Sequence, residues 1–512
     1  MKKRKLLALC LVPALLAGCA APAGVTDLSR QFEAGDPAPP EADPAADAAI
    51  GTLGAELLRA AREPGENTLL SPLSVALALS MTANGAAEDT LAEFEALLGA
   101  DVAALNANAA SLLADYAALG GSTECSIADS LWLDGRLEAN ELFLSRCTAF
   151  YGARLYQADL DTDGARRAVN NWVGEVTRGL IPEVLAETPA PETVLLLVNA
   201  LYLKNAWASE FDPLDTRPGD FTAADGSEAE TDFLSNGLRA EQYFAAEGAA
   251  GVVLPYDDGR LGFLAVLPDG ELDAWLETLD GDTLPALLAA AEEERVLLRL
   301  PKFEAEWGGE LSDALAAMGL ETAFDSGRAD FSALGTAPDG PLYVSSVVHK
   351  ARIEVNEKGT EAAAATVVEV EDAAAPTDYR ELVLDRPFCY AVVDLERGVP
   401  LFLGTFERPL RAGINPAPTM PEGGKPARRG GPCGRPPLRA GWCARLCRLR
   451  AGINPAPTMP EEGKPARRGG PCGRPPLRAG WCARPCRIRA GVGTRPYVSG
   501  TGTHSFAAPG SP

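Results

Sequence analysis

The chain has 512 residues, and 71 Asp plus Glu against 46 Lys plus Arg give a formal net charge of −25. Residues 411–512 hold 18 basic and 3 acidic residues, so the acidic excess belongs to the first 410 residues. This acidic body argues against nucleic acid as its partner, because phosphate binding needs clustered cations. The only histidines are His349 and His504, which excludes a three-histidine zinc site and disfavours a secreted histidine-dependent hydrolase.

The N-terminus has the pattern of a secretory signal peptide over residues 1–18. A basic stretch, residues 2–5, precedes an apolar run that is too short to span a bilayer. The sequence Leu16-Ala17-Gly18-Cys19 resembles the bacterial lipoprotein box, which implies cleavage before Cys19 and acylation of that residue. We therefore expect a secreted protein, lipid-anchored to the bacterial cell envelope at the outer membrane or cell surface. The alternative is an ordinary signal peptide with a chance cysteine.

Residues 19–49 are rich in Pro, Ala and Asp, a composition that predicts an extended tether between the lipid and the body. The body, residues 50–409, contains three cysteines, Cys125, Cys147 and Cys389. Their odd number allows at most one disulfide, and three buried thiols are an equal alternative.

Hydrophobic periodicity predicts a mixed α+β body in which helices precede most strands. Helices are expected over 50–62, from Ser71 as N-cap to Asn84, and over 88–98. Strands are expected over 126–133, 193–203, 251–255, 262–268, 296–301, 342–348 and 353–356, of which 193–203 is apolar enough to be buried on both faces.

Several short motifs of the body occur in order from about residue 50 to Pro409: Asn67–Ser74 (NTLLSPLS), Asp129–Trp132 (DSLW, similar to NSLW), Val169–Gly179 (VNNWVGEVTRG), Leu197–Trp207 (LVNALYLKNAW), Phe211–Pro213, Leu300–Phe303 (LPKF), Val347–Lys350 (VVHK) and Arg386–Phe388. Together they resemble the motifs of the serpin family, the large serine-protease inhibitors. The resemblance implies the serpin fold, in which helices pack around a large central mixed β-sheet with further sheets and an exposed reactive loop.

The resemblance also implies a serine-type endopeptidase inhibitor that acts once, as a suicide substrate. A serine or cysteine protease cleaves the loop and becomes trapped as a covalent acyl complex when the loop inserts into the sheet. The family's hinge matches Glu357, Gly359, Thr360, Glu361, Ala362, Ala363, Ala364, Ala365 and Thr366. We expect a monomer that is not an enzyme and carries no cofactor or metal.

The residues of the hinge support this interpretation independently. If the stretch becomes a strand, Thr360, Ala362, Ala364 and Thr366 share one face, and all four are small and uncharged. Gly359 supplies backbone freedom. The alternative is an alanine-rich loop that never inserts, which would leave a non-inhibitory serpin scaffold acting as a surface binding or chaperone-like protein.

Family spacing, counted forward from Glu357 and backward from Pro387, places the cleaved bond within Ala373–Pro376. The first choice is Ala373-Ala374 and the next Ala374-Ala375. A small apolar bait suits elastase-like or subtilisin-like proteases.

Five further matching positions are expected to be structural. Ser71, Ser74, Asn199 and His349 resemble the family's hydrogen-bonded cluster beneath the point where the sheet opens, and Trp207 matches the region where insertion starts. The family usually has Phe at the positions of Arg352 and Leu70, and the charge of Arg352 at the root of the hinge is expected to alter the insertion rate.

Residues 410–512 form a basic Pro/Gly/Arg/Cys-rich tail in which 411–449 recurs as 450–488, a repeat of 39 residues. The composition favours disorder. We interpret the repeat as a duplicated DNA element that is translated beyond the family's natural end near Pro409. The alternative is a basic module that binds metal, nucleic acid or an acidic surface.

Overall fold

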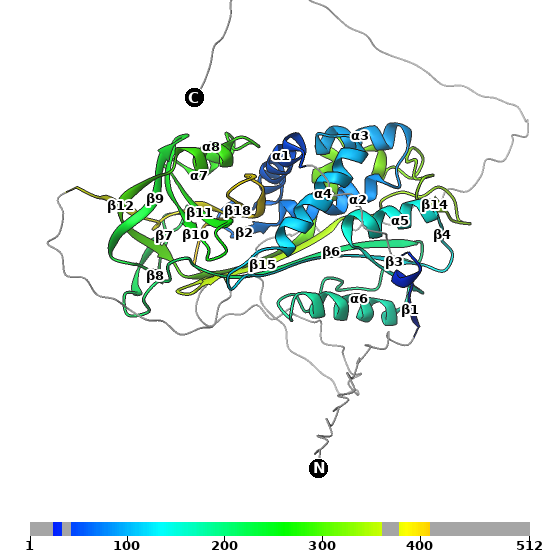
Figure 1. Cartoon of the computed structure of the whole chain (residues 1–512), viewed down its shortest axis with the longest axis horizontal. Coiled ribbons are helices and arrows are strands. Elements are labelled where there is room, and N and C mark those ends of the chain that lie inside the picture. Colours follow the sequence, from blue (N-terminus) through cyan, green and yellow to red (C-terminus); the bar gives the residue numbers. More distant parts are fainter. Residues whose placement is uncertain (1–23, 33–41, 361–377, 410–512) are drawn as a thin grey trace, which may run out of the picture. The chain divides into compact units, whose positions relative to one another are not determined.

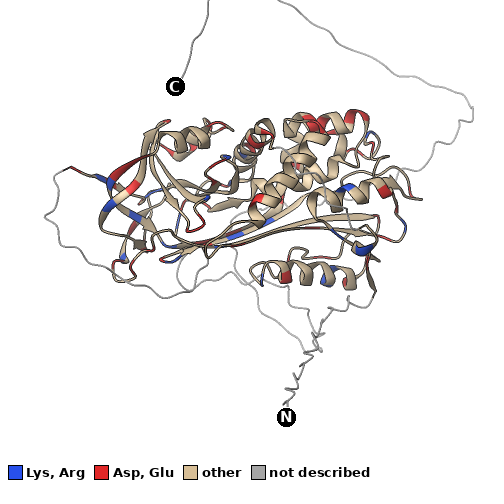
Figure 2. Cartoon of the chain, in the orientation of Figure 1, with Lys and Arg blue, Asp and Glu red and all other residues tan. Residues whose placement is uncertain are grey.

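The computed structural model describes residues 24–32, 42–360 and 378–409, which all lie in one unit of the chain (Figure 1). The helices of this part are α1 (Pro44–Ala61), α2 (Pro72–Ala83), α3 (Glu88–Leu98), α4 (Val102–Ala117), α5 (Glu141–Tyr151), α6 (Asp163–Val176), α7 (Leu272–Leu276), α8 (Thr283–Ala290) and α9 (Ser312–Ala317), with 3-10 turns η1 (Ser29–Gln31) and η2 (Thr322–Phe324). Acidic side chains are prominent along α3 (Figure 2).

One sheet of the described residues contains seven strands and is mixed, because β3 and β5 run parallel while the other pairs are antiparallel. In spatial order its strands are β1 (Val25–Asp27), β5 (Arg154–Ala158), β3 (Glu124–Leu133), β6 (Leu195–Ala206), β16 (Gly359–Thr360), β15 (Val348–Asn356) and β13 (Phe303–Glu310). Helices α2, α4 and α5 cover one face of this sheet, and α6 covers the other (Figure 1).

A second sheet of the described part curls beside the first and supplies much of the aromatic core. Its strands are, in order, β2 (Thr68–Leu70), β19 (Pro400–Phe406), β18 (Phe388–Asp394), β11 (Leu261–Pro268), β10 (Ala249–Pro255), β9 (Leu238–Ala246), β12 (Glu292–Pro301), β8 (Glu228–Leu234) and β7 (Arg217–Thr222), with β17 (Arg380–Val383) parallel to β12. A two-stranded ladder joins β4 (Glu138–Ala139) and β14 (Gly335–Thr336). The predicted α+β class is confirmed.

The prediction of an extended tether over 19–49 is wrong for the described parts of that range. β1 pairs with β5 at the edge of the seven-stranded sheet, and the Leu28 amide donates to the Leu155 carbonyl. Helix α1 also begins at Pro44, well before the predicted Ile50, because the Asp43 side chain accepts from the backbone amides of the first turn. Local capping and strand pairing outweigh the tether-like composition.

The three cysteines of the described body are unpaired thiols, with Cys147 and Cys389 buried and Cys125 partly buried. Burial raises the pKa of Cys125 and of Cys389 to about 12, so both are inert at neutral pH.

Within the described ranges no single helix has the length and apolar character to cross a membrane, and only the pair α3–α4, bent by 45°, meets that test together. No cluster of three metal-ligating side chains occurs in the same residues.

Candidate functional site

The candidate site is a slot in the seven-stranded sheet, bordered by β6 on one side and by Leu342–Val348 and β15 on the other. In the described part of the chain β6 and β15 share no ladder; on the edges that face the slot, each pairs only with the two residues of β16, at one end of the slot. Below Thr360 the facing edge of β6 therefore has no strand beside it among these residues.

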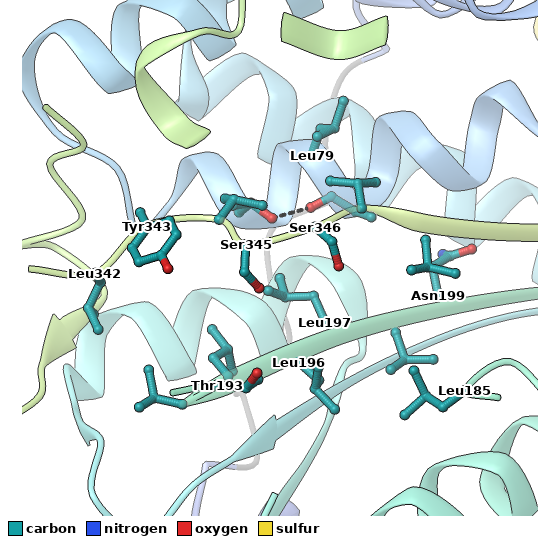
Figure 3. Close-up of a pocket in the computed structure, with 18 of the residues that line it drawn as sticks. Leu79, Leu185, Thr193, Leu196, Leu197, Asn199, Leu342, Tyr343, Ser345 and Ser346 are labelled. Atoms are coloured by element: carbon teal, nitrogen blue, oxygen red, sulfur yellow. Dashed lines mark hydrogen bonds between the residues drawn. The ribbon is translucent and has the colours of Figure 1, made fainter. Parts of the chain in front are cut away.

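The slot opens into a cavity of about 290 Å³, and α2 forms one of its walls (Figure 3). Leu79 of α2, Leu196 and Leu197 of β6, and Leu342 give it an apolar lining. Thr193, Ser345 and Ser346 add hydroxyl groups (Figure 3). The lining suits a chain segment with small and apolar side chains.

The predicted strand over 342–348 is wrong except for its last residue, since β15 begins at Val348. The Val344 amide donates to the Ala323 carbonyl and the Val347 amide to the Ser312 side chain, so neither bonds to a strand. Because the slot separates residues 342–347 from β6, these residues have no neighbouring strand in the described part of the chain with which to form a ladder. For the same reason Leu195–Leu197 are only partly buried, although the sequence predicted burial on both faces.

Gly359 closes the upper end of the slot. Its φ is +147°, a value that L side chains rarely adopt, and a Cβ atom here would lie 2.0 Å from the Asn205 carbonyl oxygen. It pairs with Ala206, and the next residue, Thr360, pairs with Asn205. Only glycine allows the backbone to come this close to β6.

Thr360, the first inward position of the predicted hinge, is buried in the core. It is 1% exposed, and its hydroxyl lies 2.6 Å from the Tyr256 hydroxyl. Tyr256 is fully buried and stacks on Trp207, with ring centroids 4.9 Å apart. A charged side chain at position 360 would be buried against these two rings.

Residues 356–358, which lead into β16, are held by Trp207, just after β6, and by Lys302 and Thr216. The Trp207 indole N–H donates to the Asn356 carbonyl at 2.9 Å, and its backbone amide donates to the Lys358 carbonyl. The Glu357 carboxylate accepts from Lys302 Nζ at 2.9 Å and from the Thr216 hydroxyl at 3.1 Å. Burial alone would raise the pKa of Glu357, but these hydrogen bonds and the Lys302 charge outweigh it and hold the pKa below its ordinary value.

The structure joins three of the four residues predicted for the cluster beneath the opening. The Ser71 amide donates to His349 Nε2 at 3.0 Å, and the Ser71 and Ser74 hydroxyls are 2.8 Å apart. Burial lowers the pKa of His349 to about 4, so this imidazole is neutral. Asn199 lies in the lining of the slot, but its amide donates to Asp129 Oδ1 at 2.9 Å instead.

The remaining predicted positions lie outside the described residues: Cys19, Glu361, Ala362, Ala363, Ala364, Ala365, Thr366, Ala373, Ala374 and Ala375. Arg352, the uncommon charge at the hinge root, lies on β15 and pairs with Glu304 at 3.1 Å. Leu70 is fully buried.

Sequence reasoning missed three contributors to the site, Tyr256, Lys302 and Asp129. Lys302 belongs to the LPKF motif, and Asp129 to DSLW, where a carboxylate in a buried strand was the available signal. Tyr256 follows a strand and gave no signal of its own.

Comparison with known proteins identifies the family. The family model "Serpin (serine protease inhibitor)" matches residues 48–409. Serpin-ZXA from Oryza sativa subsp. japonica is 35% identical over 366 residues, covering 68% of this chain and 91% of the relative. Iris from Ixodes ricinus is 32% identical over 352 residues, covering 67% and 93%.

The crystal structure of the thermophilic serpin tengpin in the native state is similar, with a TM-score of 0.70 and 30% identity, covering 75% of this chain and 99% of tengpin. The latent state of tengpin gives 0.63 and 29%, covering 72% and 99%. These relatives support serine protease inhibition in general, although some serpins are non-inhibitory. The chain therefore belongs to the serpin family.

Proposed function

We propose that this serpin inhibits serine proteases as a suicide substrate, by inserting its cleaved loop into the slot between β6 and β15. The observation that carries the proposal is the pairing of Gly359 and Thr360 at the upper end of an otherwise strand-free slot. The first two residues of the loop already hold the register that a longer strand would continue.

That register assigns a place to each later residue of the loop. Because Thr360 pairs with Asn205 and Val355, continuation puts Thr366 between Asn199 of β6 and His349 of β15. Thr366 is small and polar, so it suits this polar part of the slot. The inward residues beyond it, Val368 and Val370, would then meet Leu197 and Leu195.

The same register supports the proposed bait. Continuation brings Ala373 just beyond the lower end of β6, which begins at Leu195. Cleavage after Ala373 would thus release a strand long enough to fill the whole slot. Insertion would satisfy backbone groups along both edges, each hydrogen bond contributing about 1 kcal/mol, and would release a kinetically held native state.

The remaining parts of the proposal concern the partner and the location. Ala373-Ala374, or Ala374-Ala375, suits an elastase-like or subtilisin-like protease, which would remain bound as an acyl complex. Cys19 carries the lipid that holds a monomeric inhibitor at the bacterial cell envelope. No catalytic residue or cofactor of this chain takes part in the proposed trap.

The test is to mix the protein with an elastase-like protease and look for a covalent complex on a denaturing gel. We expect a complex that survives SDS, and we expect Thr360→Arg to give cleaved protein instead, because the guanidinium would be buried beside Tyr256. Thr222→Arg, at an exposed position of β7, is the matched control and should trap normally. Clean cleavage of the wild type without complex would support a non-inhibitory scaffold, and trapping by the Thr360 variant would refute this role of the hinge.

A further inference from the structure

A buried acid–amide pair lies in the middle of the sheet beside the slot. Asp129 of β3 and Asn199 of β6 stand directly opposite each other in the ladder. Asn199 Nδ2 donates to Asp129 Oδ1 at 2.9 Å. The second oxygen of each side chain, Asp129 Oδ2 and Asn199 Oδ1, is buried and has no hydrogen-bond partner among the described residues.

One proton would satisfy both of these oxygens. A carboxylic acid and a primary amide can pair through two hydrogen bonds, one from the amide N–H to the acid carbonyl and one from the acid O–H to the amide oxygen. The first of these bonds is present, and an ionised carboxylate lacks the donor for the second. Buried polar atoms rarely remain without partners, so the geometry favours the protonated acid.

Among the described residues, no cation acts on Asp129 in place of that proton; burial and the Asn199 hydrogen bond are what set its pKa. Its titratable neighbours Cys147 and Tyr151 of α5 are neutral, because burial raises the pKa of both. The charged residue of that helix, Arg146, is only partly buried and acts on Cys147. The polar groups of α2 and α4 that surround Tyr151 are uncharged; they are Ser80, Asn84 and Asn106. Burial raises the pKa of Asp129 to about 7, whereas the nearby Asp134, bound by Arg136 at 2.7 Å, has a pKa below its ordinary value.

We propose that Asp129 is a positioning residue for loop insertion: when protonated it holds both polar atoms of Asn199 on β3, and when ionised it leaves Asn199 Oδ1 without a donor. Asn199 lines the slot (Figure 3). A strand that enters the slot brings hydroxyl or backbone N–H donors that can bond to this oxygen. Ionisation, with the proton released to solvent, therefore destabilises the open slot relative to the filled one. This inference rests on the proposed insertion mechanism, but the pairing itself does not.

The first measurement concerns the pair alone. Infrared difference spectra of the wild type minus Asp129→Asn should show a protonated-carboxyl band that disappears around pH 7. The ratio of protonated to ionised carboxyl should be about ten to one at one pH unit below this midpoint and about one to ten at one pH unit above it. Asp134→Asn is the matched control, a second buried aspartate near the end of the same strand, and should keep this band. Absence of the band at about pH 5, where an ordinary aspartate is ionised, would overturn the proposal.

The second measurement concerns insertion. The rate of trapping of the elastase-like protease should rise severalfold more between about pH 6 and about pH 8 in the wild type than in Asp129→Asn, whose amide cannot ionise. Equal pH profiles in the two proteins, alongside a carboxyl that titrates near pH 7, would overturn the positioning role. If neither protein traps the protease, the proposed inhibition has failed. The rate at which loop-cleaved protein gains thermal stability is then measured in place of the trapping rate; a steeper pH dependence in the wild type supports the positioning role, and equal pH profiles overturn it.

Discussion

Replacing Gly359 by alanine tests how firmly the first residues of the loop are held in the sheet. The new Cβ atom would lie 2.0 Å from the Asn205 carbonyl oxygen and 2.7 Å from Ala206 Cα. Both atoms belong to the backbone of β6, so no side-chain rotation can relieve the contact. We expect the alanine to push residues 359 and 360 out of the ladder.

Two costs set the magnitude. Displacing residues 359 and 360 breaks the ladder hydrogen bonds that they make with β6 and β15, at a net cost of about 1–2 kcal/mol. Losing the bond between Thr360 and the fully buried Tyr256 hydroxyl costs about 1–3 kcal/mol, because that hydroxyl then has no partner. The first unfolding transition in urea should therefore report a loss of about 2–5 kcal/mol relative to the wild type.

The assay for function is the ratio of complex to cleaved inhibitor on a denaturing gel. In the proposed mechanism, slower entry of the hinge would give the protease time to deacylate, so the variant should yield more cleaved product per complex. Gly226→Ala is the control, because Gly226 has φ +78° and a Cβ atom added there would have no neighbouring atom within 4 Å. It should cost about 1 kcal/mol and trap normally. A Gly359 variant with wild-type stability and trapping would refute the account of the hinge.

Two further predictions concern stability. Burial holds the pKa of His349 at about 4 against about 6.5 when unfolded, so the native state loses about 3 kcal/mol as pH falls from about 6.5 to about 4. Urea midpoints of the Asp129→Asn variant should show this loss of stability, and the double variant that also carries His349→Gln should not. The Asp129→Asn background is needed because protonation of Asp129, whose pKa is raised, stabilises the native state over the same pH range. Glu407→Gln should lower the free energy of unfolding by about 3 kcal/mol, because Glu407 is fully buried and bonds to Arg62 at 2.5 Å and to the Gly65 amide at 2.6 Å. An unchanged urea midpoint would show that this ion pair contributes nothing net.

Local signals in the sequence were enough for most elements of the fold. Ser71 caps α2 and Pro72 occupies its first turn, as their types predicted, and Gly99 ends α3 in the left-handed conformation. The apolar runs gave β10 and β11 to within two residues. These elements depend on neighbours in sequence, which a pattern can report.

The departures depend on partners far away in the chain. The strand predicted over 342–348 is a largely apolar run, but the amides of Val344 and Val347 donate to Ala323 of η2 and to Ser312 instead of to a strand. Asn199 was assigned to His349 by resemblance, yet it bonds to Asp129, whose carboxylate differs from the family's asparagine. Periodicity could predict neither the missing strand nor the partner of Asn199, because both depend on the separation of β6 from β15.

The edge strand β1 has a consequence for how such an inhibitor would stand on a cell. Its pairing with β5 fixes residue 25 to the sheet, and only residues 20–24 separate it from the proposed acylated Cys19. At about 3.6 Å per residue the intervening chain reaches no more than about 22 Å. A lipid on Cys19 would thus keep that margin of the domain close to the bilayer surface, and the body would have little freedom to rotate or to move away while it waits for a protease.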